Sequence, residues 1–168
     1  MEQQKKIRHA TPGDLAALTA IYNHYIQHTS ATFDIEPFTT EQRSEWLAKF
    51  KPGTPHQCLV LEDSNGIQGY ASSSQFRPKA AYDTSVETTI YLAPGCAGQG
   101  HGSQLYGALF SALQNQPVHR CYAVITIPND ASIALHRKFG FSEAGRLTEV
   151  GYKFDRFWDT VWMEKLTG

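Results

Sequence analysis

The sequence predicts a single domain of the mixed α/β class. The 168 residues correspond to about one domain, here residues 1–168. Segments in which apolar residues alternate are interspersed with segments in which they recur every three or four positions. Their order is strand, helix, helix, strands, helix, strand, helix, strands. Hydrophobic residues make up 41% of the chain and charged residues 18%, so the chain can bury a core without a disulfide or a metal.

The composition argues against several classes of protein. Lys and Arg number 15 and Asp and Glu number 16, and the resulting formal charge of −1 disfavours nucleic-acid binding. Three widely spaced cysteines do not resemble the framework of a secreted, disulfide-rich domain. Residues 1–6 lack the apolar stretch of a signal peptide, and no apolar run approaches the ~20 residues that cross a bilayer. We therefore expect a cytoplasmic protein with no membrane contact.

The first third of the chain predicts a strand at residues 5–10 and then two helices. Thr11 is placed as the N-cap of the first helix, Pro12 at its first position and Asp14 three residues after the cap. Its apolar face carries Leu15, Leu18, Ile21, Tyr22, Tyr25 and Ile26. A second helix opens at residues 39–42, after an irregular segment at residues 28–38. Its apolar residues are Trp46, Leu47 and Phe50.

The middle of the chain predicts a hairpin and a third strand. Residues 57–62 and 67–74 flank Asn65-Gly66, two residue types that tolerate a positive φ. Residues 84–92 then alternate between the two faces of a sheet. One face carries Val86, Thr88, Ile90 and Leu92, and the other carries Ser85, Glu87, Thr89 and Tyr91.

The last third predicts a helix, a strand, a second helix and two more strands. The first helix follows residues 98–102 and ends before Pro117. Its apolar residues are Leu105, Leu109, Phe110 and Leu113. A strand at residues 121–127 precedes a helix that Asn129 caps and Gly140 ends. The final strands are residues 143–154 and 157–166.

A glycine-rich loop at residues 97–102 lies between a predicted strand and a predicted helix. Glycines allow several N–H groups to point into one concavity, and the helix N-terminus adds a partial positive charge. The P-loop sequence is absent. The dinucleotide fingerprint is incomplete, because Ser103 stands at the third glycine and residues 118–122 contain no acid. The pyrophosphate of coenzyme A and an ordinary loop that caps a helix remain as interpretations.

Residues 129–141 supply a second motif, an Asn and a small residue followed by a helix that ends in Gly140-Phe141. This resembles the second signature of the GCN5-related N-acetyltransferase (GNAT) superfamily, and the glycine loop resembles its first, Q/R-x-x-G-x-G/A. Ala97 stands where that signature usually has Gln or Arg. Five further stretches, residues 21–25, 31–37, 76–82, 86–91 and 151–154, resemble the phosphinothricin and methionine sulfone/sulfoximine N-acetyltransferases.

The resemblance implies a fold, a partner and a cofactor site. The fold is a twisted, mixed and mostly antiparallel sheet of six to seven strands, flanked by about four helices, in which two neighbouring strands splay apart. The partner is a second copy, in a homodimer. The implied acetyl-CoA contacts are Ile90, Tyr91 and Leu92 for the pantetheine arm, Gly98, Gln99, Gly100, His101, Gly102 and Ser103 for the pyrophosphate, and Asn129 and Ser132.

The candidate catalytic residue is Glu87. An α-amino group has a pKa near ~8, so a base must remove its proton before it attacks a thioester. The resemblance places a catalytic Glu at this position. The alternative is an ordinary strand carboxylate, and a free Glu with a pKa near ~4.3 is a weak base unless its surroundings raise that value. His136 and Tyr91 are candidate proton donors to the departing thiolate, and either is otherwise a core residue.

An amino-acid acceptor carries a carboxylate, which an Arg can hold through two parallel hydrogen bonds. Arg77 is the preferred candidate, with Lys79 and Tyr82 close by in sequence, and solvated surface charges are the alternative. Phe33 is a candidate wall of the acceptor site, or an ordinary core residue. Lys153, together with Trp158, is a weaker candidate that could reach a site across a dimer interface.

Other interpretations remain. The pairs His56/Cys58 and His119/Cys121 have the His-x-Cys spacing of zinc ligands, but chance spacing is favoured and we expect no metal. Cys96 could act as a nucleophile, although direct transfer does not require one. The alternatives to an amino-acid acetyltransferase are a non-catalytic acetyl-CoA sensor and an enzyme that acetylates peptide or protein N-termini.

Overall fold

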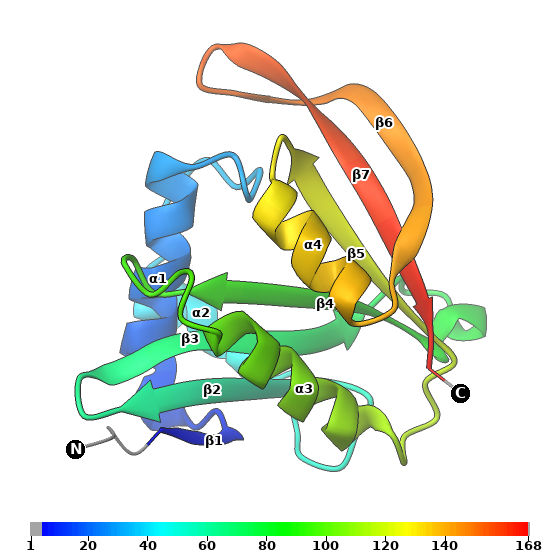
Figure 1. The fold of residues 1–168 in the computed structure, drawn as a ribbon. Helices are drawn as coiled ribbons and strands as arrows, with labels where there is room; N and C mark the ends of the chain where they lie inside the picture. The colour runs from blue at the N-terminus through cyan, green and yellow to red at the C-terminus, as the bar shows by residue number, and fades with distance from the viewer. Residues whose placement is uncertain (1–4, 168) are drawn as a thin grey trace.

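A seven-stranded sheet organises the molecule (Figure 1). The computed structural model describes residues 5–167, and the strand order is β1-β2-β3-β4-β5-β7-β6. The strands are β1 (Lys6–His9), β2 (Gln57–Asp63), β3 (Gly66–Gln75), β4 (Ser85–Leu92), β5 (Arg120–Ile127), β6 (Ser142–Lys153) and β7 (Arg156–Leu166). Within the described residues the pair β4–β5 is parallel and the other neighbouring pairs are antiparallel, which confirms the expected mixed, mostly antiparallel sheet.

Helices cover both faces of the sheet. The helices α3 (His101–Leu113) and α4 (Asp130–Lys138) lie on one face, and α1 (Leu15–His28) and α2 (Thr40–Leu47) lie on the other (Figure 1). Each side has its own core. Leu105 and Leu109 pack beside α4, whereas Leu18 and Ile21 pack beside α2. Among the described residues, no helix is long and apolar enough to cross a membrane.

The first helix opens as the sequence predicts, with Thr11 as its N-cap, Pro12 next and Asp14 completing a capping box, but its first turn is tighter than an α-helical turn. Residues 12–14 form a 3₁₀ turn, and α1 starts at Leu15. The buried carboxylate of Asp14 accepts hydrogen bonds from the Thr11 N–H at 2.8 Å and from Arg8 Nη1 at 2.7 Å. Arg8 lowers the pKa of Asp14 to about 2, so this carboxylate stays ionised and holds the tight opening turn in place.

The strands β4 and β5 pair over only three residues each. Residues 85–87 pair with residues 120–122, and the two strands then diverge (Figure 1). Glu87 and Tyr122 form the last pair. We call the point just beyond this pair the fork. The predicted splaying of two neighbouring strands is therefore confirmed.

The three cysteines occupy different surroundings. Cys58 on β2 and Cys121 on β5 are buried, and burial raises the pKa of each thiol to about 12. Since β3 and β4 lie between β2 and β5, the two His-x-Cys pairs do not lie on neighbouring strands. Within residues 5–167, no three His, Cys, Asp or Glu side chains gather as a metal site would require. Cys96 is partly exposed, and its thiol donates to Gln68 Oε1 at 2.9 Å.

Candidate active site

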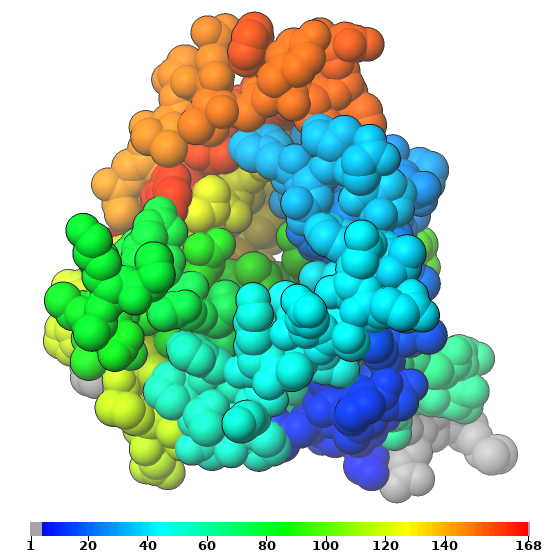
Figure 2. Space-filling model, turned by 180° about the vertical axis from the view of Figure 1, so that it is seen from behind, coloured from blue at the N-terminus to red at the C-terminus, as the bar shows by residue number. Residues whose placement is uncertain are grey.

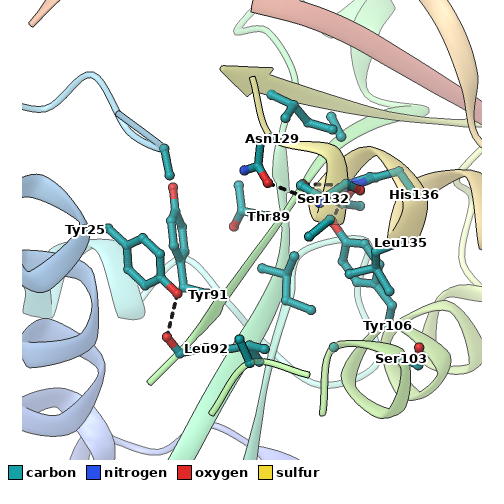
Figure 3. Close-up of a pocket in the computed structure, with 18 of the residues that line it drawn as sticks. Tyr25, Thr89, Tyr91, Leu92, Ser103, Tyr106, Asn129, Ser132, Leu135 and His136 are labelled. Carbon is teal, nitrogen blue, oxygen red and sulfur yellow. Dashed lines mark hydrogen bonds between the residues drawn. The ribbon is translucent and has the colours of Figure 1, made fainter. Parts of the chain in front are cut away.

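A cavity of about 400 Å³ lies where β4 and β5 diverge. Side chains and backbone from both strands, the glycine loop, α3 and α4 form its walls (Figure 3). Tyr25 and Tyr91 lie on one side, and Asn129, Ser132, His136 and Tyr106 lie on the other (Figure 3). A long, flexible ligand can therefore enter between two strands of the sheet.

The glycine loop has a conformation that only glycine adopts easily. Gly98 has φ 77° and Gly100 has φ 78°, and Gly100 is the N-cap of α3. The loop therefore presents backbone atoms and the positive end of a helix to the cavity, as a phosphate site requires. Two predicted side chains do not line the cavity. Gln99 donates to the Gly95 carbonyl at 3.3 Å, and the His101 ring is buried with neither nitrogen hydrogen-bonded.

The strand β4 supplies the second wall. Ile90, Tyr91 and Leu92 all line the cavity, and the edge of β4 that faces β5 is unpaired beyond Glu87 within the described residues. Peptide groups on such an edge can hydrogen-bond the amides of an extended ligand. The Leu92 carbonyl already accepts a hydrogen bond from the Tyr25 hydroxyl at 2.7 Å, which closes this end of the cavity (Figure 3).

The helix α4 supplies the third wall. Asn129 Oδ1 accepts from the Ser132 N–H at 3.2 Å, so the Asn129 side chain caps the helix, as its position in the sequence predicts. One turn later His136 also faces the cavity. Its Nδ1 donates to the Ser132 carbonyl at 2.7 Å, and its Nε2 accepts from the Tyr106 hydroxyl at 2.8 Å. His136 is 3% exposed, and burial lowers its pKa.

Tyr106 is a site residue that the sequence analysis missed. It lies on α3, is fully buried, lines the same cavity as His136, and is hydrogen-bonded to that residue through its hydroxyl. Burial raises its pKa, and the neighbouring Thr88 hydroxyl offsets part of that rise. Tyr106 follows Ser103 by three residues, so it lies one helical turn beyond the glycine loop on the same face. That spacing is the signal that could have identified it.

Glu87 lies at the fork, outside the walls of the cavity. Its side chain is on the face of β4 opposite to Val86 and Thr88, as the alternation predicts. It is half-buried, and burial raises its pKa while the positive charge of Arg77 opposes that rise. A carboxylate with a raised pKa is a better base than a free Glu.

The face of the molecule seen in Figure 2 is hollowed. The hairpin β6–β7, the segment at residues 29–39 and the segment at residues 76–84 surround the hollow (Figure 2). Arg77 lies over the rings of Phe76 and Trp162, with its guanidinium carbon 4.6 Å and 5.6 Å from the ring centres. Tyr82 packs edge-on against Phe76 at 5.6 Å. Lys79 is exposed at the start of the same turn.

Phe33 and Lys153 join the segment at residues 29–39 to the hairpin β6–β7. The Phe33 ring packs so closely on Gly151 that a Cβ there would lie 2.3 Å from a ring atom. Lys153 is 4% exposed, and its ammonium donates to the Thr32 carbonyl at 2.8 Å. Burial lowers its pKa, and Asp34 opposes that effect. Lys153 therefore anchors this segment and does not line the cavity between the strands.

These parts together define a class of protein. A cavity that suits a phosphate-bearing chain begins at the fork of a splayed sheet, beside a carboxylate whose pKa is raised by burial. The family profile described as "Acetyltransferase (GNAT) domain" matches residues 7–162. The chain therefore belongs to the GNAT family of acetyltransferases, and the class of activity is N-acetyl transfer.

The names of similar proteins indicate which members of the GNAT family this chain most resembles. The chain is 49% identical over 162 residues to the phosphinothricin N-acetyltransferase of Streptomyces coelicolor, covering 95% of both chains. Other relatives are named L-methionine sulfoximine/L-methionine sulfone acetyltransferase. The fold matches a phosphinothricin acetyltransferase from Sinorhizobium meliloti in complex with acetyl-CoA, with a TM-score of 0.92, 31% identity, and coverage of 98% of this chain and 89% of that one. It also matches a ribosomal-protein-alanine N-acetyltransferase from Brucella melitensis, with a TM-score of 0.89, 40% identity, and coverage of 96% and 99%.

Proposed function

We propose that this protein transfers the acetyl group of acetyl-CoA to the α-amino group of a small L-amino acid or analogue of the phosphinothricin, methionine sulfone or methionine sulfoximine type. One observation carries the proposal. The half-buried Glu87 carboxylate lies at the fork where the cavity between β4 and β5 begins. A base for an amine and a site for a thioester thus meet at one point of the sheet.

The cavity fits acetyl-CoA. The backbone of Gly98, Gly100 and Gly102 and the N-terminus of α3 would hold the pyrophosphate, because they present N–H groups and partial positive charge. Peptide groups of residues 90–92 would hold the pantetheine arm along the free edge of β4. Ser132, at the start of α4, faces the same arm. Bound there, acetyl-CoA supplies an activated acetyl group.

Glu87 acts as the general base. It takes a proton from the acceptor's ammonium group, directly or through one water, and the neutral amine then attacks the thioester carbonyl carbon. Burial keeps the pKa of Glu87 above that of a free Glu, which brings it closer to that of the amine. The transfer is direct, so it requires no nucleophile from the enzyme.

The acceptor would bind in the hollow between the hairpin β6–β7 and the segments at residues 29–39 and 76–84, next to Glu87. Arg77 would hold the acceptor's carboxylate, since its planar guanidinium is already oriented by the rings of Phe76 and Trp162. Lys79 and Tyr82 lie at the rim, and Phe33 forms an apolar wall. Lys153 supports that wall through the Thr32 carbonyl.

A homodimer is part of the proposal. The hairpin β6–β7 exposes a group of large apolar side chains, each 44–57% exposed, namely Leu147, Val150, Tyr152, Phe154 and Phe157. Large apolar side chains gathered on one exposed hairpin, two of which (Tyr152 and Phe157) pack together, are typical of an interface between protein copies. Light scattering after size-exclusion chromatography tests this, and a Tyr152→Glu, Phe157→Glu variant is expected to elute as a monomer.

A second acceptor class has an observation in its favour. The Brucella melitensis relative is named for acetylation of a ribosomal protein's alanine, and it is 40% identical to this chain. In this alternative the acceptor is the α-amino group of a protein or peptide, and Glu87 has the same role.

The test is release of free thiol from acetyl-CoA by the purified protein. One arm contains the L-amino acids with phosphinothricin, methionine sulfone and methionine sulfoximine, and the other contains peptides with different N-terminal residues. Turnover in the first arm supports the proposal, and turnover confined to the second transfers it to a peptide acceptor. Binding of acetyl-CoA without turnover in either arm overturns it and leaves a sensor.

A further inference from the structure

We propose that the Tyr106 hydroxyl, held in place by His136, donates a hydrogen bond to the sulfur of coenzyme A as the thiolate leaves. The inference rests on the proposed function in one respect, namely that acetyl-CoA occupies the cavity between β4 and β5. It does not depend on which acceptor is used.

The position of Tyr106 follows from the strand geometry at the fork. Glu87 and Thr88 are consecutive on β4, so their side chains lie on opposite faces of the sheet. The Thr88 hydroxyl lies near the Tyr106 hydroxyl, and both residues line the cavity. Tyr106 is therefore on the cavity side of the point at which Glu87 meets the acceptor. A thioester within reach of an amine at Glu87 has its sulfur on the Tyr106 side, because the rest of coenzyme A leads back to the glycine loop.

The hydrogen bonds of His136 decide which atom can donate. Its Nδ1 lies 2.7 Å from the Ser132 carbonyl, so Nδ1 carries the proton. Its Nε2 then carries a lone pair and accepts from the Tyr106 hydroxyl at 2.8 Å. A neutral His136 in this tautomer offers the cavity no proton. Burial lowers the pKa of His136 and so favours this neutral form.

Tyr106, unlike His136, has a proton that it can donate to a ligand in the cavity. As the C–S bond breaks, its electron pair goes to sulfur and gives a thiolate. The Tyr106 O–H turns from Nε2 to the sulfur, because a hydrogen bond to an ionised acceptor is stronger than one to a neutral imidazole. Burial raises the pKa of Tyr106, so the hydroxyl keeps its proton. Coenzyme A leaves as the thiolate and takes its proton from solvent, and Tyr106 returns to Nε2.

The other tyrosines of the cavity are Tyr25 and Tyr91. The Tyr25 hydroxyl already donates to the Leu92 carbonyl at 2.7 Å, and Tyr91 does not fit this role either. It lies on the same face of β4 as Glu87, and its ring packs against Tyr25 at 4.9 Å and Tyr22 at 5.3 Å. Tyr91 thus belongs to the aromatic cluster beside α1, whereas Tyr106 comes from α3 on the opposite side of the sheet (Figure 3).

The experiment measures the pKa of the coenzyme A thiol in its binary complex with the protein, by the ultraviolet absorbance of the thiolate. It needs no acceptor and no turnover. The variants are Tyr106→Phe and His136→Asn. The control is Tyr70→Phe, which removes a hydroxyl equally buried but on the α2 side, near Arg43. Thermal denaturation and the affinity for coenzyme A show whether each variant remains folded.

Tyr106→Phe is expected to raise the pKa of the bound thiol by about 1 to 2, the value of one hydrogen bond to a charged group, and to lower kcat about 10- to 100-fold. His136→Asn is expected to have a smaller effect in the same direction, and Tyr70→Phe none. An unchanged thiol pKa in Tyr106→Phe overturns the inference, as does a larger effect of His136→Asn. Absence of coenzyme A binding by the unaltered protein contradicts the proposed function instead.

Discussion

The two faces of the fork are built in different ways. On the α3/α4 face, the cavity is enclosed by backbone groups and by side chains that are already hydrogen-bonded, such as Tyr106 to His136 and Asn129 to the Ser132 N–H. On the α1/α2 face, a hollow lies between segments that are far apart in the chain (Figure 2), and the half-buried Glu87 points to this face of β4. Arg77 there stacks on aromatic rings, and within the described residues it forms no ion pair.

The difference corresponds to the two substrates. Every enzyme with this fold and reaction binds the same acetyl-CoA, whereas the acceptor differs from one enzyme to another. The pyrophosphate and the pantetheine arm are the same in each reaction, so backbone groups are sufficient to bind them. The acceptor varies, and side chains on loops can change without altering the sheet. Substitutions on the α3/α4 face should therefore change the binding of acetyl-CoA and not that of the acceptor. Substitutions on the α1/α2 face should do the opposite.

The largest effect is expected for Glu87→Gln. Loss of the general base should lower kcat by about 10²- to 10⁴-fold. The Kd of acetyl-CoA should remain within about twofold, a difference of under ~0.5 kcal/mol, because Glu87 does not line the cavity. Glu164→Gln is the control. Glu164 is a glutamate of β7 that pairs with Tyr122 from the other side of β5, whereas Glu87 pairs with Tyr122 from β4. Activity of Glu87→Gln equal to that of the control would show that Glu87 is an ordinary strand residue.

A smaller effect is expected for Arg77→Gln. Loss of its hydrogen bonds to a carboxylate should raise the KM of the acceptor about 10- to 100-fold. Its positive charge also opposes the rise in the pKa of Glu87, so this pKa should rise further in the variant. Activity depends on the deprotonated Glu87, and the acidic limb of kcat/KM should therefore move to higher pH. Lys79→Gln is the control, and a larger shift in that variant would contradict the role of Arg77.

The Phe33 wall can be displaced through Gly151→Ala. The added Cβ would lie 2.3 Å from the Phe33 ring, so the segment at residues 29–39 must move. Overpacking of this kind typically costs about 1–3 kcal/mol of stability. We expect the acceptor's KM to rise about tenfold, a change of ~1.4 kcal/mol, with the affinity for acetyl-CoA unchanged. Gly145→Ala on the same strand adds a methyl group with no atom within 4 Å. Equal melting temperatures for the two variants would refute the expectation.

The smallest effect is expected on the other face, for Gly100→Ala. A Cβ at Gly100 meets no atom within 4 Å, so the substitution acts only through the positive φ of 78°. That strain costs about 1 kcal/mol, which corresponds to about a fivefold weaker Kd for acetyl-CoA by calorimetry. Gly107→Ala, inside α3, should instead stabilise the protein by about 0.5–1 kcal/mol. An acceptor KM that changes more than the Kd of acetyl-CoA would contradict the conclusion that the two faces bind the two substrates independently.

Local features could be predicted from the sequence. The glycine loop, the Asn129 cap and the alternation along β4 each depend on residues within one turn or one strand. The order of the elements followed from periodicity, and the fork itself was implied by the resemblance to the GNAT superfamily. The cap at Thr11 was also predicted, whereas the 3₁₀ form of the first turn at residues 12–14 was not.

Contacts between distant residues could not be predicted in this way. The Tyr106–His136 hydrogen bond joins residues 30 positions apart, and the Lys153–Thr32 hydrogen bond joins residues 121 positions apart. Such pairs depend on how helices and hairpins pack, which the local pattern does not contain. Lys153 was expected to contact the acceptor, whereas the structure places its ammonium on a backbone carbonyl, so a direct role stays a prediction.

The distribution of thiols determines how cleanly acetyl transfer can be followed with a chromogenic disulfide reagent. Such reagents attack thiolates, and the buried thiols of Cys58 and Cys121, with pKa values of about 12, supply almost none at neutral pH. The background from the folded enzyme therefore comes from Cys96 beside the glycine loop. With a Cys96→Ser enzyme, the absorbance of the reagent would report released coenzyme A alone.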